Sequence, residues 1–322
     1  MPKFSFVIPC YRSEKTIATV VAEIKGEMAA KRPEDDFEII LVNDCSPDGV
    51  WSVIENLAKS EPNVIGINLA KNFGQHSALL AGYGKCSGDY VVSLDDDGQA
   101  PLDSLNDLIS KLEEGYDVVY AYYHEIKQNL FRRFGSWMAE KMGEAMLDPP
   151  KGFKGSSFYV ARKFVIEEMT HYRNAFPYLV GLVLRTTRKI AWVETSHRSR
   201  LEGKSGYSFW GLLKLWLNGF TAFSVKPLEF STILGVFFAF LGFGFSIFVI
   251  VRRILGITTI EGWSTIIALI LIIGGLILMM LGLIGEYIGR IYICINESPQ
   301  YVIKDVVGTS KGEIPETKRN CP

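Results

Sequence analysis

Two long stretches without a charged residue constrain this chain more than any other feature of its sequence. They run from Phe230 to Val251 and from Gly262 to Gly285. Each exceeds the roughly 20 apolar residues that a helix needs to cross a bilayer. Several glycines within both stretches would let two such helices pack closely. The pattern predicts a transmembrane hairpin over 227–292, with spans at about 230–251 and 263–285.

The segment before these stretches combines bulky apolar residues with a few polar ones. Trp210 and Trp216 lie close to Lys214, and Asn218 follows Lys214 on the same helical face. Tryptophan near cationic residues is typical of a helix that lies in the headgroup region. We therefore predict an amphipathic interfacial helix over 208–226, with a buried core helix as the alternative.

The first two hundred residues instead alternate predicted strands with predicted helices. Phe4–Pro9, Phe37–Val42 and Val64–Leu69 are short apolar runs, and the apolar spacing from Ile17 to Met28 predicts a helix. Near-continuous apolar strands joined by helices are typical of a parallel sheet that helices cover on both faces. In such sheets, ligands bind beyond the carboxyl ends of the strands. We expect an α/β domain over 1–207.

Three adjacent aspartates follow the apolar run that begins at Tyr90. Asp95, Asp96 and Asp97 repel one another, and no fold requires such a triplet. Asp95 and Asp97 are two residues apart and share a face if the strand continues. One or two carboxylates together with substrate phosphates are typical ligands of Mg²⁺ or Mn²⁺. A solvated acidic turn is the alternative interpretation of the triplet taken alone.

Two further loops are predicted at the same edge of the sheet. They are Pro9–Glu14 and Asn43–Asp48. Asp44 is either an ordinary Asx-turn residue or well placed to bond a base or ribose. Further along, Arg132 is either part of a solvated helix face or a phosphate contact. The sequence contains neither the phosphate loop of P-loop enzymes nor the dinucleotide fingerprint.

Charge and cysteine content narrow the partners and the compartment. The net charge is −1, so the chain as a whole has no excess of positive charge that would attract nucleic acid. The five cysteines have no metal or redox spacing, as expected in a reducing compartment. From the residues before the first predicted strand we expect no signal peptide. We therefore expect a multi-pass protein of the inner (plasma) membrane, with a cytoplasmic catalytic domain and a cytoplasmic, partly disordered tail over 293–322.

Several motifs, taken in order, resemble one enzyme family. Val7–Tyr11, Val42–Asp48, Asn72–Ala78 and Ser93–Pro101 together resemble family-2 glycosyltransferases with the GT-A fold. The segment Gly285–Tyr292, which follows the two apolar stretches, resembles the branch that acts on polyprenyl phosphates. Within that branch the similarity is to undecaprenyl-phosphate aminoarabinose transferases and bactoprenol glucosyltransferases.

This resemblance implies a reaction and its participants. A nucleotide sugar, with a UDP-sugar as the first expectation, would donate a sugar to a polyprenyl phosphate with inversion. The product would supply lipid-linked sugar for the cell envelope. The resemblance also implies Mg²⁺ or Mn²⁺, and a homo-oligomer, namely a tetramer.

The resemblance also implies roles for individual residues. Asp95 and Asp97 would hold the metal–diphosphate, and Asp97, Arg132 and Arg200 would be the catalytic residues. The residues implied in nucleotide binding are Pro9, Tyr11, Glu14, Asp44, Gln75 and Asp95. Those implied in holding the acceptor phosphate are Arg200, Lys204 and Tyr207.

The sequence departs from the family pattern at two places. Gly206 stands where relatives often have a basic residue, and Lys204 would compensate for it. The segment Gly155–Phe158 lacks an aspartate that many relatives have, which puts a carboxylate contact there in doubt. A processive polysaccharide synthase is an alternative, although its Gln-x-x-Arg-Trp motif is absent. A non-enzymatic membrane scaffold is another, but it leaves the aspartate triplet unexplained.

Overall fold

A computed structural model describes residues 1–123, 149–150, 152–153, 155–174, 177–195, 226–255, 262–296 and 299–308. The chain divides into two compact units. The first, which we call the globular unit, comprises Met1–Gly143, Asp148–Gly206 and Pro299–Pro322. The second, the helical unit, comprises Glu144–Leu147 and Tyr207–Ser298.

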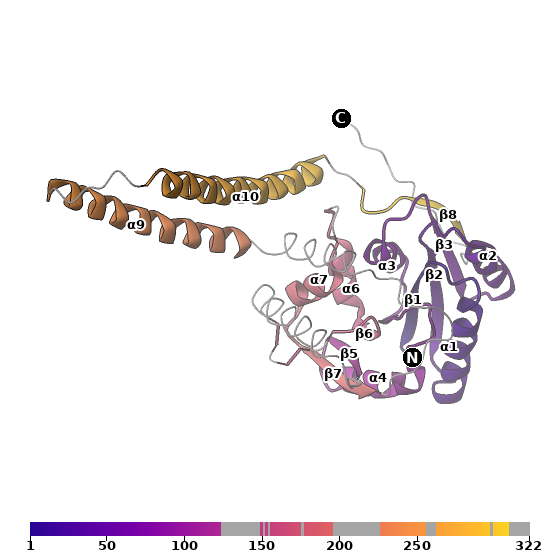
Figure 1. Cartoon of the computed structure of the whole chain (residues 1–322). Helices are drawn as coiled ribbons and strands as arrows, with labels where there is room; N and C mark the ends of the chain where they lie inside the picture. Colours follow the sequence, from indigo (N-terminus) through magenta and orange to yellow (C-terminus); the bar gives the residue numbers. More distant parts are fainter. Residues whose placement is uncertain are drawn as a thin grey trace. The chain divides into compact units, whose positions relative to one another are not determined.

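The globular unit is built on one sheet of eight strands in the order β7-β5-β6-β4-β1-β2-β3-β8 (Figure 1). The strands are β1 (Lys3–Cys10), β2 (Asp36–Asn43), β3 (Val64–Leu69), β4 (Tyr90–Ser93), β5 (Val118–Tyr123), β6 (Tyr159–Arg162), β7 (Ile190–Thr195) and β8 (Ile303–Val307). Strands β4, β1, β2 and β3 run parallel, as the sequence predicts. Antiparallel strands extend this parallel centre on both sides, since β6 runs antiparallel to β4 and β5, and β8 runs antiparallel to β3.

Helices cover both faces of this sheet, as predicted. Those described are α1 (Ile17–Lys31), α2 (Val50–Ser60), α3 (Gln75–Tyr83), the 3₁₀ turn η1 (Leu102–Ser104), α4 (Leu105–Glu113), α6 (Lys163–Thr170) and α7 (Leu179–Thr186). Helices α1, α2 and α4 share one hydrophobic core with the side chains of Phe6, Ile8 and Leu41. Helix α3 packs on the other face, where a Cβ on Gly82 would lie 2.4 Å from Val7 Cγ1. Glycine at this position therefore allows α3 to approach β1 closely.

The buried positions of α1 follow the predicted helical spacing. Ile17, Val20, Val21, Ile24 and Met28 are all at most 2% exposed. Fully burying an aliphatic side chain of this size stabilises a fold by about 1.5–3 kcal/mol. Burial of this stripe therefore fixes α1 against β1, and with it the loop that connects them.

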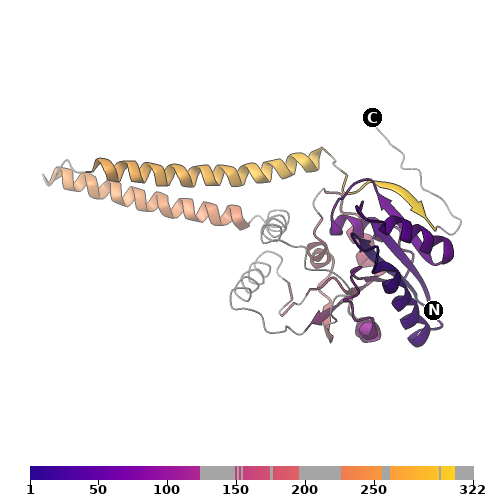
Figure 2. The same cartoon turned by 45° about the vertical axis from the view of Figure 1, so that its right-hand side comes forward.

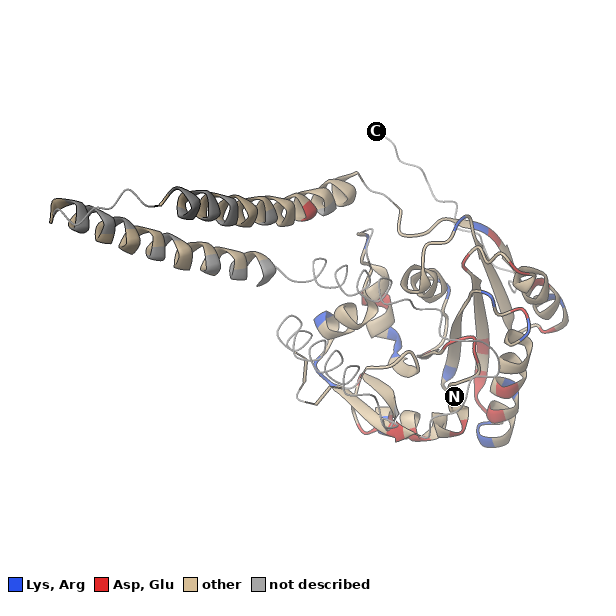
Figure 3. Cartoon of the chain, in the orientation of Figure 1, with Lys and Arg blue, Asp and Glu red and all other residues tan. Residues whose placement is uncertain are grey.

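The helical unit contains two long helices, α9 (Lys226–Ile254) and α10 (Trp263–Ile295), which run alongside each other in both views (Figures 1 and 2). The described part of α10 is almost free of charged residues (Figure 3). Its stretch Ile273–Ile295 is long and apolar enough to cross a membrane, whereas the apolar stretch found in α9, Ser231–Phe245, is shorter. Two helices therefore occupy the predicted spans, and two membrane crossings remain a prediction.

Candidate active site

The carboxyl ends of the parallel strands β4, β1 and β2 bring three loops to one edge of the sheet. We call residues 11–16, which follow β1, the first loop, and residues 44–49, which follow β2, the second loop. Residues 94–101, which follow β4, form the acidic loop. The register pairs Cys10 with Asn43, so the first and second loops start side by side. Ser93 pairs with Val7, so the acidic loop starts three residues earlier along β1 and runs beside it to the first loop, where Asp96 accepts the N–H of Tyr11. Segments far apart in the sequence thus meet where the sequence analysis expects a ligand.

Asp95 is held by two donors from different elements. Gln75 Nε2, in the first residue of α3, donates to Asp95 Oδ1 at 2.7 Å. Ser157 Oγ, just before β6, donates to Asp95 Oδ2 at 2.6 Å. Each carboxylate oxygen can accept more than one hydrogen bond or ligand. The two contacts therefore orient the half-buried carboxylate at the edge of the sheet.

Asp96 connects the acidic loop to the first loop. The backbone N–H of Tyr11 donates to Asp96 Oδ2 at 2.9 Å, and Thr16 Oγ1 donates to the backbone oxygen of Asp96 at 2.7 Å. Burial raises the pKa of Asp96 to about 6, and the neighbouring charges of Asp95 and Asp97 contribute to this rise. The middle carboxylate thus has a positioning contact that the sequence analysis did not assign to it.

Asp97 shapes the turn that follows the strand. Its Oδ1 accepts the backbone N–H of Gln99 at 3.1 Å, as in an Asx turn. Gly98 between them has φ of 71°, a left-handed conformation that glycine adopts without strain. The side chain of Asp97 is half-buried. The turn and the ligand interpretations are therefore compatible, because one hydrogen bond to a carboxylate oxygen does not prevent the group from also binding a cation.

Asp44 is almost completely buried, at 3% exposure. Its Oδ1 accepts the N–H of Phe73 at 2.7 Å and its Oδ2 accepts the N–H of Gly74 at 2.8 Å. Burial raises the pKa of Asp44 in spite of these two hydrogen bonds. In this structure Asp44 therefore fixes the start of α3, and its predicted contact with the nucleotide remains a prediction.

The first and second loops are cross-linked by the backbone and by acidic side chains. Glu14 Oε2 accepts the N–H of Gly49 at 3.0 Å, at the start of α2. The N–H of Glu14 in turn donates to Asp48 Oδ2 at 3.1 Å. Among the other residues predicted to bind nucleotide, Pro9 is buried in β1, whereas Tyr11 is 43% exposed. Tyr11 is therefore the side chain of this pair that can meet a ligand.

The donor set suits a hard divalent cation that shares its ligands with a substrate. No group of three or more His, Cys, Asp and Glu side chains forms a metal cage within the part of the chain that the structure describes. Mg²⁺ is commonly held by one or two carboxylates plus phosphate oxygens rather than by a protein cage. The oriented carboxylate of Asp95 and the half-buried carboxylate of Asp97, at one strand end, fit that mode.

Four predicted site residues lie outside the described residues: Arg132, Arg200, Lys204 and Tyr207. The predicted interfacial helix, up to residue 225, lies outside them as well. Ser157 and Asp96 are the functional candidates that sequence reasoning missed. The absence of the family aspartate near Ser157 was the one signal that could have drawn attention to that segment.

The chain is similar to known proteins over almost its whole length. Residues 5–170 match the family described as "Glycosyl transferase family 2", and residues 226–291 match "GtrB C-terminal hairpin". The undecaprenyl-phosphate 4-deoxy-4-formamido-L-arabinose transferase of Proteus mirabilis is 35% identical over 315 residues, 96% of this chain and 95% of that protein. A Bacillus subtilis protein named "Uncharacterized glycosyltransferase YkcC" is 31% identical over 95% of this chain and 94% of its own length.

A solved structure shares the fold of the globular unit. Glucosyl-3-phosphoglycerate synthase from Mycobacterium tuberculosis, crystallised with Mn²⁺ and UDP-glucose, matches with a TM-score of 0.50 and 19% identity. The match covers 68% of this chain and 77% of that chain. The sheet described above thus has the GT-A arrangement.

Proposed function

The chain belongs to glycosyl transferase family 2 and is a glycosyltransferase, and from that premise we propose that it transfers a sugar from a nucleotide sugar to undecaprenyl phosphate. The undecaprenyl-phosphate transferase of Proteus mirabilis, which matches over almost the whole of both chains, supports this acceptor. A UDP-sugar is the first donor to test. The product would be a lipid-linked sugar for glycan or lipid modification in the cell envelope.

One observation carries the donor side of the proposal. Asp95, oriented by Gln75 and Ser157, and Asp97, in the turn closed at Gln99, follow the same strand at the carboxyl edge of the sheet. A diphosphate would be repelled by these carboxylates alone, because all of the groups are anionic. A shared Mg²⁺ or Mn²⁺ would join them and neutralise the charge that grows on the leaving nucleoside diphosphate. The solved GT-A neighbour with Mn²⁺ and UDP-glucose supports this choice.

The acceptor needs little activation by the protein. A phosphate monoester is already largely dianionic near neutral pH, because its second pKa is about 6. We therefore assign no strong general base and propose a single displacement with inversion. Arg200, Lys204 and Tyr207 would hold the acceptor phosphate, and Arg132 would lie near the reacting phosphates, on the basis of the sequence pattern. Alanine variants of Arg200 and Lys204 should raise the lipid KM while nucleotide affinity stays near wild type.

The membrane arrangement is part of the proposal. The match of residues 226–291 to the GtrB C-terminal hairpin supports two spans, which would leave the catalytic domain and the tail on the same side, and we propose that this is the cytoplasmic side. Labelling of single cysteines placed in the tail and in the connection between α9 and α10 tests this topology. A tail that is labelled from the periplasmic side would contradict it. Light scattering of the purified chain tests the expected homo-tetramer.

The direct test of the function is a nucleotide-sugar screen. The full chain in detergent is incubated with undecaprenyl phosphate, Mg²⁺ and one nucleotide sugar at a time, and the lipid product is read by mass spectrometry. We expect a product that carries one sugar. A long polymer would favour a processive synthase, and no product with any donor would contradict the proposal. Asp107→Asn is a matched control, since Asp107 is an exposed aspartate in the first turn of α4.

A further inference from the structure

A row of polar side chains crosses the sheet beside the candidate active site. The pairing of β2 with β3 places Asn43 opposite Asn68, and the pairing of β3 with β8 places Asn68 opposite Asp305. We call these three residues the polar row. Asn43 and Asn68 are 3% and 8% exposed, so their amides need partners within the protein. The row ends at Asn43, the last residue of β2, where the second loop begins.

Three hydrogen bonds connect the row to the second loop. Asn68 Nδ2 donates to Asp305 Oδ2 at 2.9 Å, and Asn43 Nδ2 donates to Asn68 Oδ1 at 2.8 Å. The backbone N–H of Ser46 then donates to Asn43 Oδ1 at 3.1 Å. Every amide in the row thus uses one N–H and its oxygen along the same line.

The carboxylate of Asp305 fixes the direction of this chain of bonds. A carboxylate only accepts hydrogen bonds, so it draws the NH₂ group of Asn68 and turns the oxygen of Asn68 toward Asn43. The same logic turns the oxygen of Asn43 toward Ser46, whose N–H needs an acceptor. The Asp305 carboxylate at one end and the Ser46 N–H at the other therefore require the same orientation of the two amides. Reversal of the amides would set acceptor against acceptor at Asp305 and donor against donor at the Ser46 N–H.

The effect of the row extends into both loops that the proposed function assigns to the donor. Ser46 Oγ accepts the N–H of Arg12 at 2.8 Å and donates to Asp48 Oδ1 at 2.6 Å. Asp48 Oδ2 accepts the N–H of Glu14 at 3.1 Å. Ser46 therefore links the amides of the polar row to the backbone of the first loop.

We propose that Asp305 is a positioning residue for nucleotide binding. Through Asn68 and Asn43 it holds Ser46, and thereby the first and second loops, in the conformation that binds the donor. The inference rests on the proposed function, because it takes these loops as the nucleotide pocket. Asp305 follows α10 in the sequence and lies 237 residues after Asn68. The strand that follows the helical unit thus becomes part of the donor site.

The test is a graded series at position 305 in the full chain. Asp305→Asn keeps an oxygen that can accept from Asn68, Asp305→Ala removes it, and Asp305→Lys replaces an acceptor with a donor. UDP, GDP and CDP are titrated with Mg²⁺, and the donor KM, lipid KM and kcat are measured. Lys304→Ala, at the exposed neighbouring position of β8, is the matched control.

We expect nucleotide affinity to fall in the order wild type, Asn, Ala, Lys. The loss should be about three- to tenfold for Asp305→Ala, as for one hydrogen bond, and larger for Asp305→Lys. The donor KM should rise in parallel, while kcat and the lipid KM stay near wild type. Hydrogen exchange at the Ser46 amide should quicken in the same order. A merely structural strand would give a lower unfolding temperature without this split.

The proposed function and the proposed role of Asp305 can be overturned separately. A wild-type chain that binds no nucleotide and uses no donor overturns the proposed function, and the inference falls with it. If wild type binds nucleotide, and the Asp305→Ala and Asp305→Lys variants bind it as tightly as wild type does, the proposed role of Asp305 is wrong while the proposed function is unaffected. If Asp305→Lys does not fold, the comparison of Asp305→Asn with Asp305→Ala decides in the same way.

Discussion

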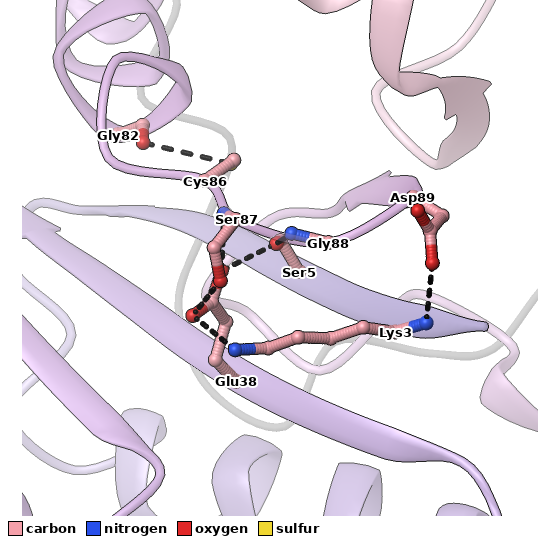
Figure 4. A network of polar contacts seen from close by, with 8 residues as sticks. All are labelled: Lys3, Ser5, Glu38, Gly82, Cys86, Ser87, Gly88 and Asp89. Atoms are coloured by element: carbon pink, nitrogen blue, oxygen red, sulfur yellow. Dashed lines mark hydrogen bonds and ion pairs between the residues drawn. The ribbon is translucent and has the colours of Figure 1, made fainter. Parts of the chain in front are cut away.

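The amino ends of β1 and β2 carry a polar cluster of their own, opposite in character to the one at their carboxyl ends. Glu38 lies at its centre and is 7% exposed (Figure 4). Its Oε1 accepts from Ser5 Oγ at 2.6 Å and from the N–H of Ser87 at 2.7 Å. Its Oε2 accepts from Ser87 Oγ at 2.8 Å and lies 3.2 Å from Lys3 Nζ. The fold itself therefore supplies Glu38 with four partners.

The acidic loop at the other end has the opposite electrostatics. Burial alone would raise the pKa of Glu38, but the hydrogen bonds from Ser5, Ser87 and Lys3 outweigh it and lower that pKa. The pKa of Asp96 is raised to about 6, chiefly by burial and also by Asp95 and Asp97. Hydrogen bonds thus outweigh burial at Glu38, whereas at Asp96 burial outweighs the hydrogen bonds, which include the one from the Tyr11 N–H.

The contrast separates a carboxylate that supports the fold from carboxylates that are suited to a ligand. Three adjacent anions at a strand end are costly for the protein alone, and a divalent cation with a diphosphate would relieve that cost. Glu38 already has an ammonium group and three hydrogen-bond donors around it, so a cation would add less there. The same substitution at the two ends should therefore change different quantities.

The largest expected effect is on Asp97. Asp97→Asn removes one negative charge from the proposed metal–diphosphate contact and keeps the shape of the side chain. We expect sugar transfer to fall by at least about 100-fold, in the range seen when one stabiliser of transition-state charge is removed. The unfolding temperature should stay near wild type. Turnover near wild type, with a metal still required, would contradict the assignment.

The corresponding change at the amino end, in Glu38, should lower the stability of the fold and leave sugar transfer unchanged. Glu38→Gln replaces one acceptor oxygen with a donor that faces the donors of the cluster. The unfolding free energy should fall by about 1–3 kcal/mol, the cost of a buried group left unsatisfied. Transfer per folded molecule should not change. Denaturation of the full chain and turnover in the same preparation measure the two quantities, and lost turnover in the folded variant would break the comparison.

Two serines allow a smaller and more closely matched comparison. Ser157 Oγ donates to Asp95 Oδ2 and Ser87 Oγ donates to Glu38 Oε2. Ser157→Ala should weaken donor binding by about two- to tenfold, the worth of one hydrogen bond to a charged group in part exposed to solvent. Ser87→Ala should lower the unfolding temperature and leave donor KM unchanged. If the two variants have equal donor KM values, the proposal that Ser157 positions Asp95 for donor binding is wrong.

The smallest expected effect is on the pH dependence of stability. The folded-state pKa of Glu38 lies below its ordinary value of 4.5, so the folded protein binds this proton more weakly than the unfolded chain. The contribution of Glu38 to stability is therefore complete above pH 4.5 and is lost as the pH falls below that value toward the folded-state pKa. Unfolding temperatures of wild type and Glu38→Gln should converge on acidification. A constant difference down to the lowest pH would contradict this origin.

Local patterns were enough to predict the central parallel strands and the ligand edge. The apolar spacing of α1 and the apolar runs of β1, β2 and β3 are patterns among residues close together in the sequence. The sequence alone was therefore enough to predict these elements. Strand β8 was missed and placed within a partly disordered tail. Its residues Ile303–Val307 alternate only weakly, and its partner β3 lies far away in the sequence. The residues around 303–307 contain no pattern that indicates pairing with β3.

The candidate site shows the same division. The triplet and its strand were predicted from their own composition, and Gln75 was expected near the nucleotide. The contact of Ser157 with Asp95 joins residues that are 62 positions apart, and the contact of Tyr11 with Asp96 joins residues 85 apart. Whether Asp44 faces a ligand or its own backbone depends on how α3 begins, which only the packed structure reveals.

The most direct test of the central claim is the effect of metal on nucleotide affinity. UDP, GDP and CDP are titrated into wild type, Asp97→Asn and Asp107→Asn, each with Mg²⁺ and with a chelator. We expect Mg²⁺ to strengthen binding of the preferred nucleotide by at least about tenfold in wild type and Asp107→Asn, because the cation bridges two anions, and by little in Asp97→Asn. The same gain from Mg²⁺ in all three proteins, or none in wild type, would contradict the claim that the carboxyl-end aspartates hold a metal–diphosphate.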